Sequence, residues 1–201
     1  FQGRMEFGPR ALGCRSILGD ARSPEMQSVM NLKIKFRESF RPFAPSVLAE
    51  RATDYFQLPP DTDSPYMLLV ADVDEAKRAG DPASLGEPQG FDKLRVERSQ
   101  IQAVTHVDHS ARVQTVDRDR HPLYHQLISE FEKRTGCPVI INTSFNVRGE
   151  PIVATPEDAF LCFMATGMDM LALGPFVMKK EEQPESLKVN TEDHVAGFEL
   201  D

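Results

Sequence analysis

A run of β-branched residues, Val139–Ile141, leads directly into a loop of polar and basic side chains. The run is typical of a buried strand, which would deliver Asn142, Thr143, Ser144 and Arg148 to the edge of a sheet. Amide and hydroxyl groups offer directed hydrogen bonds there, and the planar fork of an arginine suits a carboxylate or a phosphate. The pattern predicts an anion-binding loop, although Asn, Ser and Gly are equally common in ordinary turns.

Two basic stretches lie in the first third of the chain. Residues 3–16 hold three glycines and three arginines with little helical or strand periodicity, which predicts a rigid loop with Arg10 facing a phosphate. Residues 33–45 interleave Lys35 and Arg41 with phenylalanines, a pattern that can hold a nucleotide by phosphate pairing and stacking. The alternatives are a connector with solvated arginines and a surface strand whose aromatic side chains face inward.

Residues 103–116 alternate like a β-hairpin whose turn is Asp108–Ser110. This hairpin would project Arg112 from one face of a sheet. His106, on its first strand, is a further candidate for substrate binding. No carboxylate or cysteine recurs near these residues at the spacing of metal ligands, so we expect no metal site in the chain.

The elements that must position these side chains have recognisable boundaries. Pro122–Thr135 carries apolar residues at helical spacing and is followed by Gly136, which predicts a helix. Thr155 opens a second helix with a capping-box pattern, and Ser23 is expected to cap a third. Short strands are predicted at 46–48, 67–73, 170–173 and 176–178.

Two segments lack the pattern of packed structure. Residues 74–98 are charged, contain Gly and Pro and show no periodic apolar face, so we expect a mobile insertion loop. Residues 181–201 are polar and acidic, and we expect a disordered tail there. Residues 1–180 then fit one domain.

Composition limits the class of function. The chain of 201 residues has a net charge of −8, which argues against a general nucleic-acid binder, while its local basic patch suits a small anionic ligand. Its 3 cysteines fit neither a disulfide framework nor a zinc site, so a reducing cytoplasm is the expected compartment. No stretch is long and apolar enough to span a membrane. Phe1 is not a natural initiator, so we expect further sequence to precede it.

Three stretches, in this order, resemble signatures of the O-carbamoyltransferase family, which includes the nodulation and antibiotic-tailoring carbamoyltransferases. They are residues 4–13 with 15–18, residues 35–38 with 40–48, and residues 142–153. The resemblance is to the C-terminal domain of that family and covers nearly everything except the insertion and the tail. One departure is Cys14, which stands where the family usually carries an asparagine, so a side-chain amide role at this position does not carry over.

The resemblance implies an α/β, YrdC-like fold, a twisted mixed sheet flanked by helices around a basic cavity. ATP, with Mg, and carbamoyl phosphate would form carbamoyl-adenylate there. A preceding actin-like ATPase-type domain, which holds iron, would pass the carbamoyl group to a hydroxyl of a small-molecule acceptor. The family's anion-binding positions carry over to Arg10, Lys35 and Arg41, and then to Arg112, Asn142, Ser144 and Arg148. A non-catalytic nucleotide- or RNA-binding YrdC-like module is the alternative.

Overall fold

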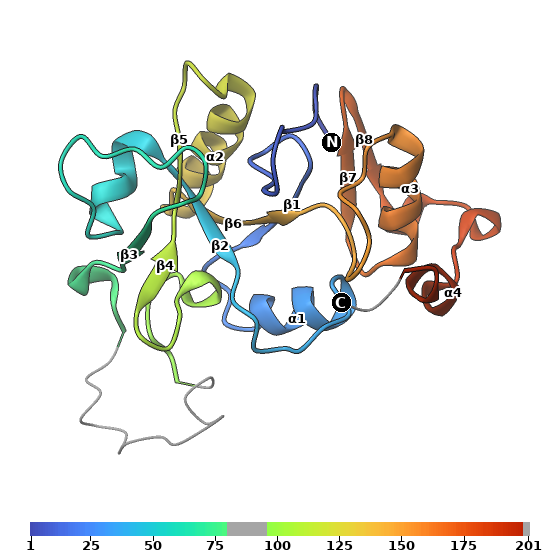
Figure 1. The fold of residues 1–201 in the computed structure, drawn as a ribbon, viewed down its shortest axis with the longest axis horizontal. Helices are drawn as coiled ribbons and strands as arrows, with labels where there is room; N and C mark the ends of the chain where they lie inside the picture. The colour runs from blue at the N-terminus through green and yellow to red at the C-terminus, as the bar shows by residue number, and fades with distance from the viewer. Residues whose placement is uncertain (80–95, 199–201) are drawn as a thin grey trace. The chain divides into compact units, whose positions relative to one another are not determined.

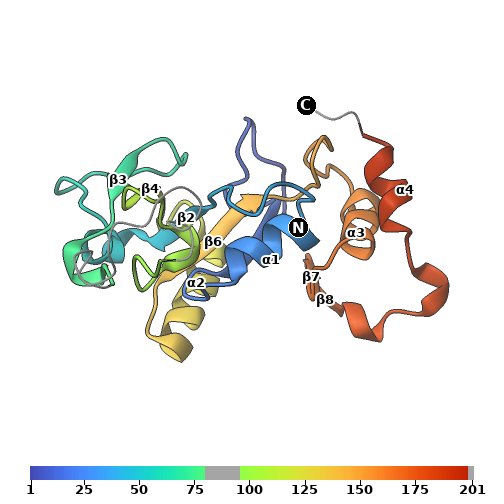
Figure 2. The same ribbon diagram turned by 90° about the horizontal axis from the view of Figure 1, so that it is seen from below.

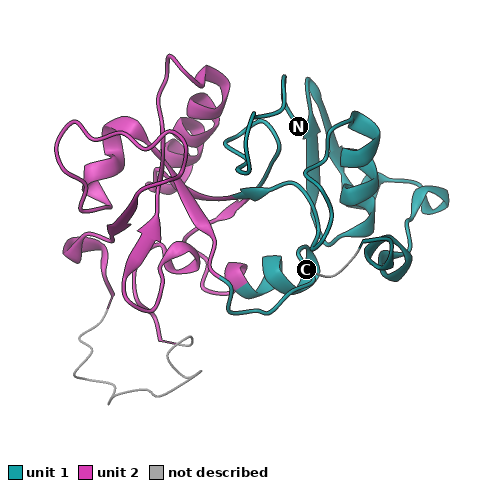
Figure 3. Ribbon diagram, viewed as in Figure 1, with its two compact units in different colours: residues 1–17, 28–41, 143–201 teal, residues 18–27, 42–142 magenta. Residues whose placement is uncertain are grey.

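The computed structural model describes residues 1–79 and 96–198 of the chain (Figure 1). Its contacts divide the chain into two compact units, which Figure 3 distinguishes by colour. Unit 1 comprises residues 1–17, 28–41 and 143–201, and unit 2 comprises residues 18–27 and 42–142. Helices and strands mix in both units, so the predicted α/β class is confirmed.

Four strands form a mixed sheet: β1 (Ser16–Asp20), β2 (Ala44–Leu48), β5 (Gln114–Val116) and β6 (Val139–Ser144). Their order is β1-β6-β2-β5. Strand β2 pairs parallel with β5 and antiparallel with β6, and all of its residues are buried. The first four residues of β6 are buried as well. The predicted buried strand that leads into the polar loop is therefore confirmed.

Helix α2 (Pro122–Thr135) packs on this sheet within unit 2 and has the bounds that the sequence predicts. Gly136 ends it in the left-handed conformation, at a φ of 75°, where a glycine has no Cβ to clash. One buried cluster joins the helix to three strands through Leu48, Val116, Tyr124, Ile128 and Ile140. Leu127, one of the residues whose helical spacing predicts an apolar face, is exposed, so the sheet covers a narrower face of the helix.

The hairpin predicted over residues 103–116 is wrong. A 3₁₀ helix, η5 (Gln102–Val104), occupies its first part. Strand β4 (Ser110–Arg112) pairs antiparallel with β3 (Val70–Asp72), whereas β5 belongs to the larger sheet. The alternating pattern identifies strand-forming residues but not their partners, because backbone hydrogen bonds can form with any strand of suitable register.

The expected insertion at 74–98 falls mainly on residues 80–95, which lie outside the described residues. Its flanks are hydrogen-bonded. Asp74 caps the 3₁₀ helix η2 (Glu75–Lys77) by accepting from the Ala76 N–H, and the Ala79 N–H donates to the Arg98 carbonyl at 2.9 Å. Another 3₁₀ helix of unit 2 is η1 (Ala49–Asp54).

Unit 1 contains the helix α3 (Pro156–Ala165) beside a hairpin of β7 (Met170–Leu173) and β8 (Phe176–Lys179), as Figures 1 and 2 show. Thr155 and Asp158 form the predicted capping box at the start of α3. Helix α1 (Met26–Lys33) begins two residues later than the predicted start at Pro24. The Met26 N–H donates to the Ser23 carbonyl at 3.2 Å, so a turn precedes the helix.

The segment after Lys179 differs from the expected disordered tail. It contains η6 (Lys180–Glu182), η7 (Glu185–Leu187) and α4 (Thr191–Ala196). Asn190 caps α4, and the Thr191 hydroxyl donates to the Ala165 carbonyl at the end of α3 at 2.8 Å. A helix cap and a hydrogen bond to a carbonyl at the end of α3 hold this segment, and the polar composition of the segment reveals neither of them.

Within the described ranges, no helix has the length and apolar character needed to cross a membrane. The three cysteines, Cys14, Cys137 and Cys162, are all free.

Candidate anion-binding site

Lys35 lies just beyond the C-terminus of α1 and has only 3% of its surface exposed. Its ammonium group donates to the backbone oxygens of Ser144 and Asn146 and, at 2.7 Å, to Asn146 Oδ1. Burial, followed by the nearby charge of Arg37, lowers the pKa of Lys35 to about 7. An ammonium group has three protons. Each of the three protons can therefore be donated to one of these three oxygens, so Lys35 holds the loop that follows β6 in place.

The same loop is braced from its other end by Glu150. The Val147 N–H donates to Glu150 Oε2 at 2.7 Å, and Asn146 Nδ2 donates to the Glu150 carbonyl at 2.6 Å. Asn146 Oδ1 also accepts from the Ser144 hydroxyl at 2.7 Å. Thr143 and Ser144, two predicted site residues, are half-buried at the end of β6. These bonds hold the backbone of the loop in one conformation.

Asn31, buried on α1, organises the segment that carries the other basic residues. Its Nδ2 donates to the carbonyl oxygens of Ser39, at 3.1 Å, and Arg41, at 2.8 Å. Its Oδ1 accepts from Arg37 Nε at 2.6 Å. The Nδ2 and Oδ1 atoms of this one side chain together hold residues 37–41 against α1.

Three arginines, Arg37, Arg41 and Arg148, surround Glu38 and form what we call the arginine cluster. Arg41 Nε lies 3.2 Å from a carboxylate oxygen of Glu38. A hydrogen bond from its own backbone N–H lowers the pKa of Glu38, and the charges of the three arginines lower it further. Burial and then the charge of Arg41 lower the pKa of Arg37. The cluster has more positive than negative charge, which suits an anion such as a phosphate.

The loop of residues 3–15 is held from inside by two charged side chains. Glu6 Oε1 accepts from the N–H groups of Leu12, at 2.7 Å, and Cys14, at 2.8 Å. Arg15 is buried and donates to backbone oxygens on the same loop. Arg10 is exposed on this loop. The segment has the loop conformation that its glycines predict, and contact between Arg10 and a phosphate stays a prediction.

Asn142, a further predicted site residue, belongs to unit 2 and is buried in β6. Its Nδ2 donates to Gln114 Oε1 at 2.7 Å, and the same oxygen accepts from the Ser46 hydroxyl at 2.6 Å. These bonds link three neighbouring strands through their side chains. In this structure Asn142 therefore contributes to the interior of the sheet.

Arg112 and His106 also belong to unit 2. Arg112 lies on β4, where its Nη2 is 3.9 Å from Met67 Sδ. Burial lowers the pKa of His106, and the charge of Arg112 lowers it further, whereas Asp108 opposes this shift. The two residues are thus close enough to interact, and a contact of either with substrate stays a prediction.

Unit 1 brings Lys35 into direct contact with Ser144, and it places Arg41 and Arg148 around one carboxylate. Sequence reasoning did not select Arg37, although that residue lies two positions from Lys35 and in the same basic stretch. It also missed Asn31. This asparagine lies in an ordinary amphipathic helix, and only the three-dimensional contacts reveal its part in the site.

The sequence matches known proteins along its whole length. It is 59% identical over 201 residues to an uncharacterized protein of Synechocystis, covering 100% of this chain and 32% of that protein. It is 46% identical to the nodulation protein NolO of Bradyrhizobium diazoefficiens, covering 93% of this chain and 30% of the relative. The nodulation protein NolNO of Sinorhizobium fredii is 44% identical over 89% of this chain and 24% of its own length.

The chain therefore spans about a third or less of the relatives that it matches. A family model described as the carbamoyltransferase C-terminus matches residues 1–180. The three stretches that resemble family signatures, within residues 4–18, 35–48 and 142–153, all lie in this range. The chain belongs to the carbamoyltransferase C-terminus family.

Proposed function

We propose that this chain is the part of an O-carbamoyltransferase that binds ATP and carbamoyl phosphate and forms carbamoyl-adenylate. A preceding actin-like domain, which would hold iron, transfers the carbamoyl group to a hydroxyl of a small-molecule acceptor. Family membership supports the class of reaction. The arginine cluster is the observation that supports ATP and carbamoyl phosphate as the ligands. Both molecules are strongly anionic, and the cluster offers guanidinium groups on a braced segment.

The proposed reaction requires the protein to bind two anions, ATP and carbamoyl phosphate, next to each other. Their repulsion in a site of reduced dielectric amounts to several kcal/mol, and fixed cations offset it without reorganisation. Arg37, Arg41 and Arg148 would bind phosphate oxygens. Lys35 acts through the loop that it fastens and is therefore a positioning residue in this proposal. Glu38 is the carboxylate of the cluster that could face a Mg²⁺ ion on the nucleotide.

The mechanism needs no covalent enzyme intermediate. Positioning and electrostatic stabilisation are sufficient for reactions at phosphate groups. The cysteine thiols fit a role outside catalysis, since burial raises the pKa of both Cys137 and Cys162 and keeps them protonated. Three free cysteines also support the cytoplasm as the compartment.

Calorimetry with ATP and carbamoyl phosphate, singly and together, tests the proposal. We expect binding of ATP and a carbamoyl-phosphate-dependent consumption of ATP, with no carbamoylation of an acceptor until the preceding domain is restored. Arg41→Ala should weaken ATP binding by about 1.5 kcal/mol or more, the scale of a charge-assisted hydrogen bond. Arg51→Ala is the matched control, because Arg51 is an exposed arginine of unit 2 that pairs with Asp54 and Glu132.

Three results would decide against this function. Equal ATP affinity in the wild type and Arg41→Ala would show that the arginine cluster does not bind ATP. Nucleotide binding without any turnover would favour a non-catalytic binding module. Transfer to an acceptor by this chain alone would contradict the division of work between the two domains.

A further inference from the structure

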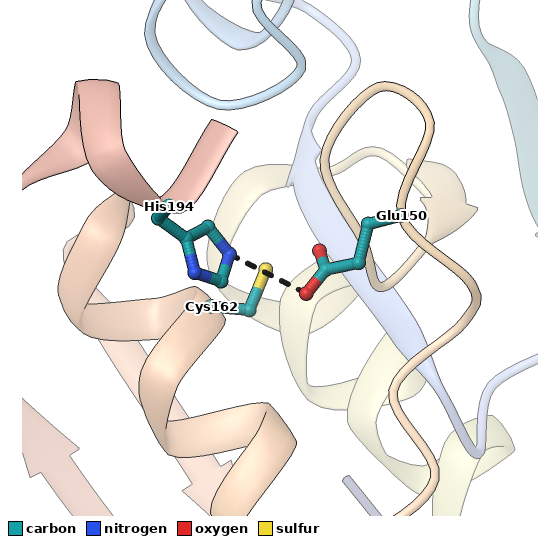
Figure 4. Close-up of side chains that lie close together, drawn as sticks. All are labelled: Glu150, Cys162 and His194. Carbon is teal, nitrogen blue, oxygen red and sulfur yellow. Dashed lines mark ion pairs between the residues drawn. The ribbon is translucent and has the colours of Figure 1, made fainter. Parts of the chain in front are cut away.

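Three possible metal ligands that are distant in the sequence meet inside unit 1 (Figure 4). Glu150 comes from the loop after β6, Cys162 from α3 and His194 from α4. One ligand atom from each, a carboxylate oxygen, the thiol sulfur and an imidazole nitrogen, lie within 4.8 Å of one another. Figure 4 shows the three side chains converging on one point.

The cluster is enclosed. Cys162 is fully buried, and the side chains of Glu150 and His194 are only 8% and 13% exposed. His194 Nε2 is buried and has no hydrogen-bond partner among the described residues. It lies 3.4 Å from Glu150 Oε1. A buried polar atom without a hydrogen bond is uncommon in a folded protein and points to a partner that the described residues do not supply.

The separation of the nitrogen and oxygen ligands fits a tetrahedral ion. Nitrogen and oxygen ligands bind Zn²⁺ at 2.0–2.2 Å, so two of them around one tetrahedral ion are about 3.3–3.6 Å apart. The 3.4 Å between His194 Nε2 and Glu150 Oε1 falls in this range. Glu150 Oε2 is already held by the Val147 N–H at 2.7 Å. Outer contacts of this kind orient a carboxylate so that its other oxygen faces the metal.

We propose that Glu150 Oε1, Cys162 Sγ and His194 Nε2 bind one Zn²⁺ ion, with a water molecule in the fourth position. Thiolate, imidazole and carboxylate are all established zinc ligands. Binding displaces the thiol proton to solvent, and one thiolate and one carboxylate then balance the charge of the ion. This proposal replaces the expectation that the chain has no metal site.

A bound ion would link three elements of unit 1 at one point. It would tie α4 and α3 to the loop that Lys35 and Glu150 brace. The site is separate in its chemistry from the arginine cluster, because its ligands suit a soft or borderline cation and the cluster suits an anion. Zinc binding can therefore be tested without any assumption about ATP or carbamoyl phosphate.

The test is a titration of the metal-free chain with Zn²⁺ alone, in competition with a chromophoric chelator. We expect one ion per chain, and at least a tenfold weaker affinity in His194→Gln and in Cys162→Ala. Co²⁺ should give the charge-transfer absorption of a cobalt thiolate in the wild type, and Cys162→Ala should lack it. The melting temperature should rise with Zn²⁺ in the wild type but not in His194→Gln.

Two matched variants serve as controls. Cys137→Ala removes the other buried cysteine, which lies in unit 2, and His121→Gln removes a histidine outside the cluster. Both should bind Zn²⁺ as the wild type does, with circular dichroism confirming the fold of every variant. Wild-type zinc affinity in His194→Gln, or a wild-type cobalt spectrum in Cys162→Ala, would overturn the proposal. Failure of the wild type to bind Zn²⁺ would overturn it as well.

Discussion

Replacing Asn31 by leucine should loosen the segment of residues 37–41 and lower the stability of the chain. Leucine has nearly the same size but cannot make the three side-chain hydrogen bonds of Asn31. Two of these bonds join neutral groups and are worth about 1 kcal/mol each, and the third, to the Arg37 guanidinium, is worth about 1.5–3 kcal/mol. Because Ser39 and Arg41 are exposed, water can replace part of the loss, so we expect about 2–4 kcal/mol.

Urea unfolding monitored by circular dichroism measures this loss, and calorimetry measures the accompanying change in ATP affinity. Leu32→Ala is the control on the same helix, because Leu32 is 55% exposed and its truncation should cost less than about 0.5 kcal/mol. Asn31→Asp keeps the acceptor for Arg37 but loses both donated bonds. A free energy of unfolding for Asn31→Leu within about 0.5 kcal/mol of the wild type would refute the role that we assign to Asn31.

Three further predictions concern other parts of the chain. Arg10→Ala should weaken ATP binding by about 1.5 kcal/mol, and an unchanged affinity in calorimetry would exclude contact between Arg10 and the nucleotide. Between pH 7 and about 8.5 the free energy of unfolding should rise with pH, because folded Lys35 has a pKa of about 7 and loses a proton that the unfolded chain keeps. Lys35→Met should lack this rise in urea titrations, so equal slopes for the two proteins would contradict it. Thr155→Ala should cost about 1 kcal/mol in urea unfolding by removing the capping box of α3, and a loss below about 0.3 kcal/mol would argue against that cap.

The parts of the fold that the sequence predicts well are those set by local interactions. Helix α2 has a periodic apolar face and a terminal glycine, and α3 has a capping box, so nearest neighbours determine their bounds. The strands β4 and β5 were predicted as partners and are not, because alternation along a strand contains no information about what lies beside it.

The candidate site is likewise predictable from the sequence where its residues are close along the chain, and not where they are distant. The basic stretch around Lys35 is visible in the sequence because its charges are close along the chain. The backbone oxygens that Lys35 contacts lie more than a hundred residues later, at Ser144 and Asn146. The cluster of Glu150, Cys162 and His194 has no sequence signal at all, since its members are twelve and thirty-two positions apart and meet only through tertiary packing.

The division of the chain into two units has a consequence for how it folds during synthesis. Unit 1 is assembled from three separate segments. Residues 42–142 of unit 2 leave the ribosome before the last and longest segment of unit 1, residues 143–201. The first loop must therefore wait for partners such as Phe145, whose N–H donates to the Arg15 carbonyl at 2.9 Å. Contacts so distant in sequence form slowly, since a large loop must close first. A ribosome that pauses near residue 142 would expose unit 1 residues without their partners, and this interval is where chaperones would be needed most.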